Sequence, residues 1–256
     1  MDNDYRSVTE IAGDDVSMEQ ISRLCNRYYW ASEFCIGKDV AEVACGSGQG
    51  LGFLNDVSSS FVAGDYSPDI VQIAKKYYRN RITIEVFDAQ KMPYRDNSKD
   101  VIIIFEAIYY LPDFEKFIIE CKRVLRNNGL ILIATANKDL FDFNPSPFSF
   151  VYYGVKELND ILCKHGFKPQ FYGDTPITEV SFLQKIMRPV KKTAVDLNLL
   201  PKSMKAKKML KRLIFGELVN MPAEIDKKTS KYIVPDVIST IQENVQYKVI
   251  LCAAQL

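Results

Sequence analysis

A glycine-rich turn is the first part of the sequence whose residue types could do chemistry. It runs from Glu42 to Gly50 as Glu-Val-Ala-Cys-Gly-Ser-Gly-Gln-Gly, after an apolar stretch that predicts a strand over 39–44. Without a Cβ, glycines let a ligand approach the backbone, and amides at the start of the next helix can bond it. A dinucleotide fingerprint needs Gly or Ala three residues after Gly48, where Leu51 stands, which argues against a dehydrogenase.

Two carboxylates follow later strand-like segments. Asp65 comes about twenty residues after the glycine-rich turn, the spacing at which a carboxylate can accept both hydroxyls of a ribose. Its alternative role is helix capping, although Ser67, followed by Pro68, is the better cap. Asp88 stands beside an aromatic residue. Its carboxylate can accept a hydrogen bond from the amine of an adenine while the aromatic side chain packs on the face of that base. These positions suit an adenosine-containing ligand.

The segment after the next apolar run carries a carboxylate and two phenols. Glu106 is the best candidate for a general base, with Tyr109 and Tyr110 as orienting or proton-relaying hydroxyls. Glu106 could instead only position a cofactor, and the tyrosines could only form an aromatic wall. The single histidine, His165, ends a predicted helix, where a cation suits the helix dipole, so we expect a structural role for it.

These residues need a scaffold, and the apolar pattern supplies one. Strand-like runs alternate with amphipathic helices, and runs such as Val101 to Phe105 are apolar throughout, which suits a parallel sheet covered on both faces. The sequence therefore predicts a doubly wound α/β sheet, whose ligands bind beyond the carboxyl ends of the strands. The expected strands are 39–44, 60–65, 82–87, 100–105, 129–136, 167–172 and 247–253, and the expected helices are 15–35, 50–57, 68–79, 113–126 and 155–165.

With these motifs in order, residues 36–172 and the final strand resemble the class I S-adenosylmethionine-dependent methyltransferases, more closely the subgroup that methylates small molecules. The resemblance implies a Rossmann-like sheet of seven strands, mostly parallel, whose last strand is antiparallel. It also implies that Gly46 and Gly48 pass beneath the methionine part of the cofactor, and that Asp65 holds its ribose. The implied cofactor site comprises Glu42, Ala44, Cys45, Gly46, Gly48, Asp65, Tyr66, Asp88, Ala89, Gln90, Phe105 and Glu106.

The sequence departs from the family pattern at two positions. Ala44 replaces the first glycine of the usual motif, which we expect to be tolerated if its φ is negative. Tyr110 stands where many members of the family place a histidine. The expected chemistry is therefore in-line methyl transfer to an acceptor held in place, without histidine.

The expected organisation is an N-terminal helical lid over 1–35, a methyltransferase core over 36–173 and 246–256, and a helical insertion over 174–245. Within the insertion, residues 185–212 carry ten Lys and Arg against one acid, Asp196, which leaves −8 for the rest of the chain. We call residues 185–212 the basic segment. It suits a phosphate-bearing acceptor, although a solvated helix face or a subunit interface would look the same.

The leading prediction is O-methylation of a small molecule, a nucleotide-linked or otherwise phosphorylated sugar, since the chain resembles methyltransferases of bacterial surface-sugar biosynthesis. One alternative is a methyltransferase acting on RNA or another macromolecule, which the near-neutral net charge of +1 disfavours. The other is a non-catalytic cofactor-binding or membrane-surface protein with helices 178–200 and 203–215 on anionic lipid.

Composition restricts the class of protein. The 256 residues are 47 % hydrophobic and 25 % charged, as in globular proteins. The six cysteines form no C-x-x-C pair, so we expect reduced thiols, mostly in the core, and no metal site. The acidic N-terminus has no signal-peptide pattern and no apolar run is long enough to span a bilayer, so a cytoplasmic protein is expected.

Overall fold

The computed structural model describes residues 5–177, 217–241 and 243–256. Short 3-10 helices, Tyr5–Val8 and Ile108–Tyr110, accompany the main elements. The strands and helices are β1 (Asp15–Ser17), α1 (Met18–Cys35), β2 (Asp39–Val43), α2 (Leu51–Asn55), β3 (Ser60–Asp65), α3 (Pro68–Tyr78), β4 (Thr83–Val86), β5 (Lys99–Phe105), α4 (Phe114–Val124), β6 (Leu125–Ala136), α5 (Val155–Lys164), β7 (Lys168–Pro176), β8 (Leu218–Asn220), β9 (Asp236–Val237) and β10 (Tyr247–Gln255).

The central sheet has the order β4-β3-β2-β5-β6-β10-β7-β9. Pairing is parallel from β4 to β6, and β10 is antiparallel to both β6 and β7. The predicted doubly wound sheet with an antiparallel last strand is confirmed. The two-residue strand β9 adds a short edge beside β7 that the sequence pattern did not indicate.

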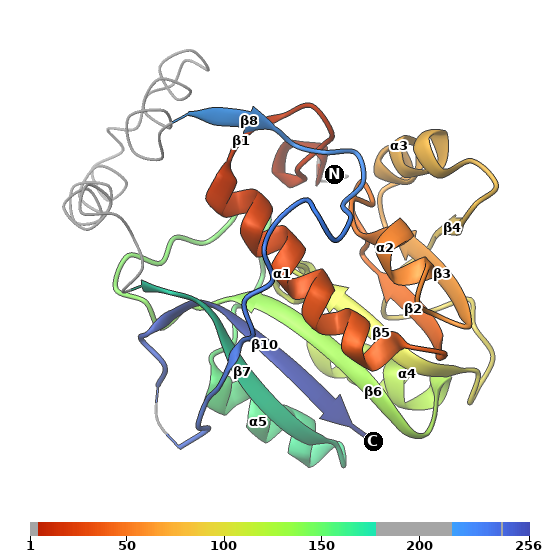
Figure 1. Ribbon diagram of the computed structural model, residues 1–256. Helices are drawn as coiled ribbons and strands as arrows, with labels where there is room; N and C mark the ends of the chain where they lie inside the picture. The colour runs from red at the N-terminus through yellow and green to blue at the C-terminus, as the bar shows by residue number, and fades with distance from the viewer. Residues whose placement is uncertain (1–4, 178–216, 242) are drawn as a thin grey trace.

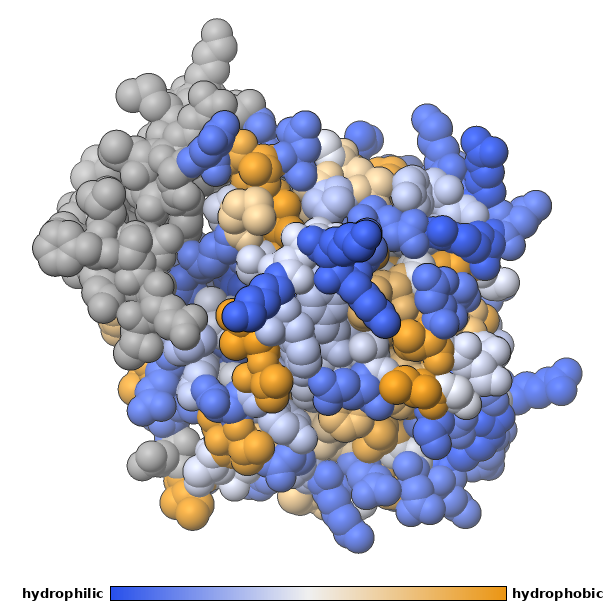
Figure 2. Space-filling view, viewed as in Figure 1, coloured by the Kyte–Doolittle hydropathy of each residue, from blue (hydrophilic) through white to orange (hydrophobic). Residues whose placement is uncertain are grey.

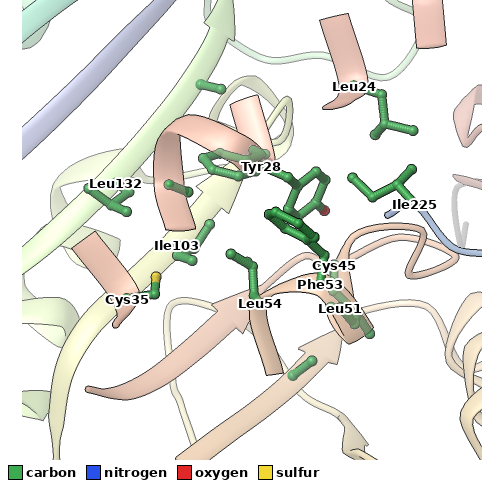
Figure 3. Packing of buried hydrophobic residues seen from close by; sticks show 14 of the residues in the cluster. Leu24, Tyr28, Cys35, Cys45, Leu51, Phe53, Leu54, Ile103, Leu132 and Ile225 are labelled. Carbon is green, nitrogen blue, oxygen red and sulfur yellow. The ribbon is translucent and has the colours of Figure 1, made fainter. Parts of the chain in front are cut away.

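Helices cover both faces of this sheet, as Figure 1 shows. The buried side chains of α1, α2 and α3 pack with one set of strand residues, and those of α4 and α5 pack with the alternate set. Strand β5 illustrates the alternation, because Ile103 belongs to the first cluster while Ile102 and Ile104 belong to the second. Figure 3 shows side chains of α1 and α2 gathered against Ile103 and Leu132, with Ile225 from the chain after β8 beside them.

The predicted end of one helix is wrong in an informative way. The helix expected over 113–126 ends at Val124, because Leu125 already pairs with Lys99 of the neighbouring strand. The sequence Asn127-Asn128-Gly129 predicts a stop just after residue 126, since Asn and Gly tolerate a left-handed cap, and Asn128 does take that conformation (φ 62°). Strand pairing thus ends the helix before this stop signal.

The chain on either side of the predicted core forms a second, two-stranded sheet. Residues 1–35 were expected to be a helical lid, but β1 precedes α1 and pairs antiparallel with β8. Strands of three residues are too short to show a period of two in the sequence. The expected end of the first core segment at residue 173 falls inside β7, which continues to Pro176. The basic segment and the helices expected over 178–200 and 203–215 lie outside the described residues.

The expectation that the cysteines lie mostly in the core is confirmed, since five of the six are buried and only Cys163 is exposed. Within the described residues, no helix is both long enough and apolar enough to cross a membrane. Figure 2 shows hydrophilic residues over much of one face, with hydrophobic residues in separate small groups.

Candidate active site

A cavity of about 590 Å³ lies at the carboxyl ends of β2, β3 and β5. Its volume falls within the range of small-molecule and cofactor sites. Every residue predicted for the site lines it except Gly48. The predicted lining residues are Glu42, Ala44, Cys45, Gly46, Asp65, Tyr66, Asp88, Ala89, Gln90, Phe105, Glu106, Tyr109 and Tyr110.

Gly48 instead supports the glycine-rich turn from behind. Its carbonyl accepts a hydrogen bond of 2.7 Å from the buried Tyr78 hydroxyl. Its φ is +90°, and a Cβ there would lie 3.0 Å from Leu51 and 3.2 Å from the Tyr78 ring. Close packing and the backbone conformation account for a glycine at this position, and its expected place beneath the cofactor stays a prediction.

Ala44 does not meet the condition under which we expected it to be tolerated. Its φ is +51°, in the left-handed region, and not negative. This conformation costs an L-residue roughly 1–2 kcal/mol because the Cβ approaches the following carbonyl oxygen. The strained residue lines the cavity at the end of β2.

Asp65 joins the ends of two neighbouring strands. Its Oδ2 accepts from the amide of Gly46 and its Oδ1 from the amide of Ser67, both at 2.9 Å. Burial raises the pKa of this carboxyl, although these backbone donors oppose the shift. Ser67 is the N-cap of α3 but makes no side-chain capping bond. A carboxylate oxygen can accept more than one hydrogen bond, so Asp65 can still bind a hydroxyl in the cavity.

Glu42 is buried at the end of β2 with half of its carboxyl unpaired. Tyr28 of α1 donates its hydroxyl to Glu42 Oε1 at 2.6 Å, while Oε2 is buried without a partner. Burial raises the pKa of Glu42 to about 8. An unsatisfied buried oxygen that lines a cavity fits a ligand carrying a cationic N–H donor.

Asp88 and Gln90 form the far wall. Asp88 Oδ1 accepts from the amide of Gln90 at 2.8 Å, and the Gln90 Oε1 accepts from the amide of Asp113 at 3.1 Å. These bonds fix the loop after β4 against the start of α4. Ala89 between them is buried, so this part of the wall is small and flat enough for an aromatic base.

Glu106 follows β5 in a constrained conformation. Its φ is +50°, and its amide donates to the carbonyl of Ala134 at 2.8 Å. The Tyr109 hydroxyl donates to Glu106 Oε2 at 3.2 Å. Arg27 Nη1 lies 3.6 Å from the other carboxylate oxygen. Backbone strain of this kind persists only where the surrounding contacts hold it.

The two tyrosines after Glu106 point to different partners. Tyr109 is buried, and its ring stacks on Tyr152 at a centroid distance of 4.2 Å. The Tyr110 hydroxyl instead lies 2.5 Å from Ser146 Oγ, in the long loop after β6. The structure therefore brings Tyr109, but not the Tyr110 hydroxyl, together with Glu106. His165 is the C-cap residue of α5 and pairs with Glu115, outside the cavity lining, as its expected structural role requires.

Several lining residues were missed because they come from the ends of the chain. Arg23 and Arg27 of α1 and Lys248 of β10 line the cavity. The segment before β1 lies against the glycine-rich turn, since the Glu10 carbonyl accepts from Ser47 Oγ at 2.7 Å and from Gln49 Nε2 at 2.8 Å. The i, i+4 spacing of the two arginines was the available signal, and an antiparallel last strand necessarily begins at the ligand edge.

Comparison with known proteins agrees with this architecture. A solved structure of a SAM-dependent methyltransferase from Archaeoglobus fulgidus superposes with a TM-score of 0.58 at 15 % identity, covering 94 % of this chain and 95 % of that one. The chain has the class I methyltransferase fold. Residues 41–133, which run from within β2 to within β6, match the family described as a methyltransferase domain.

Curated relatives match part of this chain. A probable S-adenosylmethionine-dependent methyltransferase of Mycolicibacterium smegmatis is 33 % identical over 138 residues, or 52 % of this chain and 53 % of the relative. A probable phthiotriol/phenolphthiotriol dimycocerosates methyltransferase 2 of Mycobacterium ulcerans is 34 % identical over 101 residues, or 38 % and 39 %. The match to the first spans about half of that relative, and neither name supports the sugar-biosynthesis subgroup.

Proposed function

We propose that this chain transfers a methyl group from S-adenosylmethionine to a small-molecule acceptor, the oxygen of a phosphorylated or nucleotide-linked sugar. One observation carries the methyl-transfer proposal. A single cavity is lined both by the acids after β2, β3 and β4 and by the Glu106–Tyr109 pair after β5. A ligand bound by the acids after β2, β3 and β4 would place its reacting group next to Glu106 and Tyr109.

The residues present fit the proposed cofactor. Asp65 would accept the ribose hydroxyls, and the Asp88–Gln90 wall would edge the adenine. The ammonium of the methionine part would favour the ionised form of Glu42, whose unpartnered Oε2 would then accept a hydrogen bond from it. When bound, S-adenosylmethionine supplies an electrophilic methyl group on a sulfonium.

Glu106 has the geometry of a general base. In an in-line displacement the acceptor oxygen must lose its proton as it bonds to the methyl carbon, and Glu106 would take that proton. Tyr109 would orient the carboxylate through its 3.2 Å hydrogen bond. Arg27 Nη1, 3.6 Å from the other carboxylate oxygen, would help to hold the Glu106 side chain in place.

Transfer of labelled methyl groups into a fractionated cell extract tests this proposal. Label in the phosphorylated small-molecule pool supports it and makes a nucleotide-sugar panel the next step. Label confined to nucleic acid or protein would overturn the small-molecule acceptor, and no transfer into any fraction would overturn methyl transfer itself.

Glu106→Gln tests the base. We expect kcat to fall at least about 100-fold, the typical contribution of a positioned base, while the Kd of S-adenosylhomocysteine changes less than about threefold. Isothermal titration calorimetry and a methyl-transfer assay give the two values. Glu115→Gln, which alters an exposed carboxylate paired with Lys164, is the matched control and should leave kcat unchanged. Equal loss of turnover and of cofactor affinity would contradict the assignment.

A lipid acceptor is the second candidate. The Mycobacterium ulcerans relative, which matches 38 % of this chain, is a lipid methyltransferase. The same labelling experiment separates the candidates, because a lipid product extracts into organic solvent and a phosphorylated sugar stays in water.

A further inference from the structure

Helix α1 presents two arginines to the cavity. Arg23 and Arg27 are four residues apart and therefore lie on one face of the helix, and both line the cavity. The Nε of each is buried without a hydrogen-bond partner. Among the described residues, the Arg23 side chain makes no ion pair and no hydrogen bond. Buried donors without partners are uncommon in folded proteins and call for an explanation.

The position of Arg23 relative to the sheet separates it from the proposed cofactor contacts. The cavity is also lined by Ala136, which ends β6, and by Lys248 and Val249, which begin β10. In the sheet order, β6 and β10 lie on the opposite side of β5 from β2 and β3, whose ends carry the glycine-rich turn and Asp65. Asn26, three residues after Arg23 on α1, donates to Asp174 of β7, beyond β10, at 2.6 Å. This part of α1 therefore lies toward β10 and β7 rather than toward β3, which ends at Asp65.

The acids that line the cavity or lie beside α1 have partners of their own. Glu10 accepts from Gln20 at 2.7 Å, and Asp174 accepts from Asn26 at 2.6 Å. Glu19 pairs with Lys248, and Glu106 faces Arg27. None of these four acids therefore forms an ion pair with Arg23, which is a cation of the cavity wall.

Resting on the proposed function, we infer that Arg23, flanked by Arg27 and Lys248, binds a phosphate group of the methyl acceptor inside the cavity. A guanidinium offers a planar fork of donors that matches two phosphate oxygens. Binding there would give the unpaired donors their partners and would hold the acceptor by a group remote from the methylated oxygen. The subsite lies within the described core and needs no contribution from the basic segment.

Calorimetric titration of the full chain, saturated with S-adenosylhomocysteine, tests the subsite with inorganic phosphate and glucose 1-phosphate as probes. We expect Arg23→Gln to weaken both probes at least tenfold and Arg23→Lys, which keeps the charge but loses the fork, to weaken them less. Arg95→Gln, an exposed arginine outside the cavity lining, is the matched control and should stay within twofold of the wild type. Circular dichroism of each variant checks that it is folded. If Arg23→Gln does not fold, the comparison of Arg23→Lys with the wild type tests the subsite.

Three outcomes would overturn the inference. One is that neither probe binds the wild type, or that methyl glucoside binds as tightly as glucose 1-phosphate. Another is that Arg23→Gln weakens S-adenosylhomocysteine tenfold and leaves phosphate unchanged, which would assign Arg23 to the cofactor carboxylate. The third is unchanged phosphate binding in the folded variants. If the chain transfers no methyl group but binds phosphate in a way that depends on Arg23, the proposed function is refuted and the phosphate subsite is still supported.

Discussion

At the residue scale, the end of β2 combines two unfavourable features that line the same cavity. Ala44 holds a left-handed backbone conformation, and Glu42 buries a carboxyl oxygen without a partner. Both cost free energy in the folded chain. Such features persist at sites where a ligand removes the cost or requires the geometry.

Ala44→Gly should raise the free energy of unfolding by about 0.5–1 kcal/mol. Glycine removes the left-handed strain, and the larger entropy of the unfolded chain offsets part of the gain. Urea denaturation measures the change. Ala41→Gly, in the middle of β2 where no positive φ occurs, is the control and should destabilise the chain. Similar destabilisation by both substitutions would show that position 44 is not strained.

Glu42→Gln should change how stability depends on pH. The folded-state pKa of Glu42 is raised from 4.5 to about 8, so the folded chain binds the extra proton. Protonation of Glu42 therefore stabilises the folded chain. This contribution to the free energy of unfolding is fully present below pH 4.5 and is lost as pH rises toward 8, at up to about 1.4 kcal/mol per pH unit. Glutamine removes this contribution. Unfolding free energies at pH 5, 6.5 and 8 should fall more steeply for the wild type than for the variant, and parallel curves would contradict the prediction.

The sequence could indicate the site residues that end strands, because a strand end is a local feature. Asp65, Asp88 and Glu106 were predicted in this way and all line the cavity. The sign of φ at Ala44 and the partners of the two tyrosine hydroxyls could not be predicted, because they depend on how distant segments pack. Arg23 was missed for the same reason.

At the scale of elements, the start of α1 connects the helix to the segment above the glycine-rich turn. Ser17 and Gln20 form a capping box, in which Gln20 Oε1 accepts from the Ser17 amide at 3.0 Å. The same Gln20 side chain donates to Glu10 Oε1 at 2.7 Å. One residue therefore both starts the helix and fixes a wall of the cavity.

Gln20→Ala and Ser17→Ala should separate these two roles. Each should lower the free energy of unfolding by about 1 kcal/mol through loss of the cap. Only Gln20→Ala should weaken S-adenosylhomocysteine, by several-fold, because it releases Glu10. Urea denaturation and calorimetry measure the two effects. An equal loss of affinity in both variants would mean that the helix start, and not the Glu10 contact, sets the affinity.

The long alternating pattern predicted the central elements well, and the strand over 60–65 has the expected bounds. Elements of two or three residues were missed, since β1, β8 and β9 are defined by pairing partners far away in the chain. The end of α4 was misplaced because pairing at Leu125 overrode a local stop signal.

At the scale of the whole molecule, cofactor binding should stabilise the fold. At 100 times its Kd, S-adenosylhomocysteine should add about 2.7 kcal/mol, which for a chain of this size raises Tm by about 5–10 °C. Differential scanning calorimetry with and without ligand measures the shift. In the Asp65→Ala variant, the ligand should raise Tm much less, relative to the Tm of the same variant without ligand. An undiminished shift in that variant would place the ligand away from Asp65.

The antiparallel direction of β10 has a consequence for how this molecule can change over evolution. Tyr247 pairs with Pro176, and the amide of Ile177 donates to the carbonyl of Gln246 at 2.8 Å. The stretch between β7 and β10, which includes β9 beside β7, therefore begins and ends at one point of the sheet, on the edge where the cavity lies. Because its ends are already held together, lengthening it costs closure entropy only logarithmically. New residues can accumulate there without disturbing the strands, so acceptor preference can diverge while the remainder of the fold is inherited unchanged.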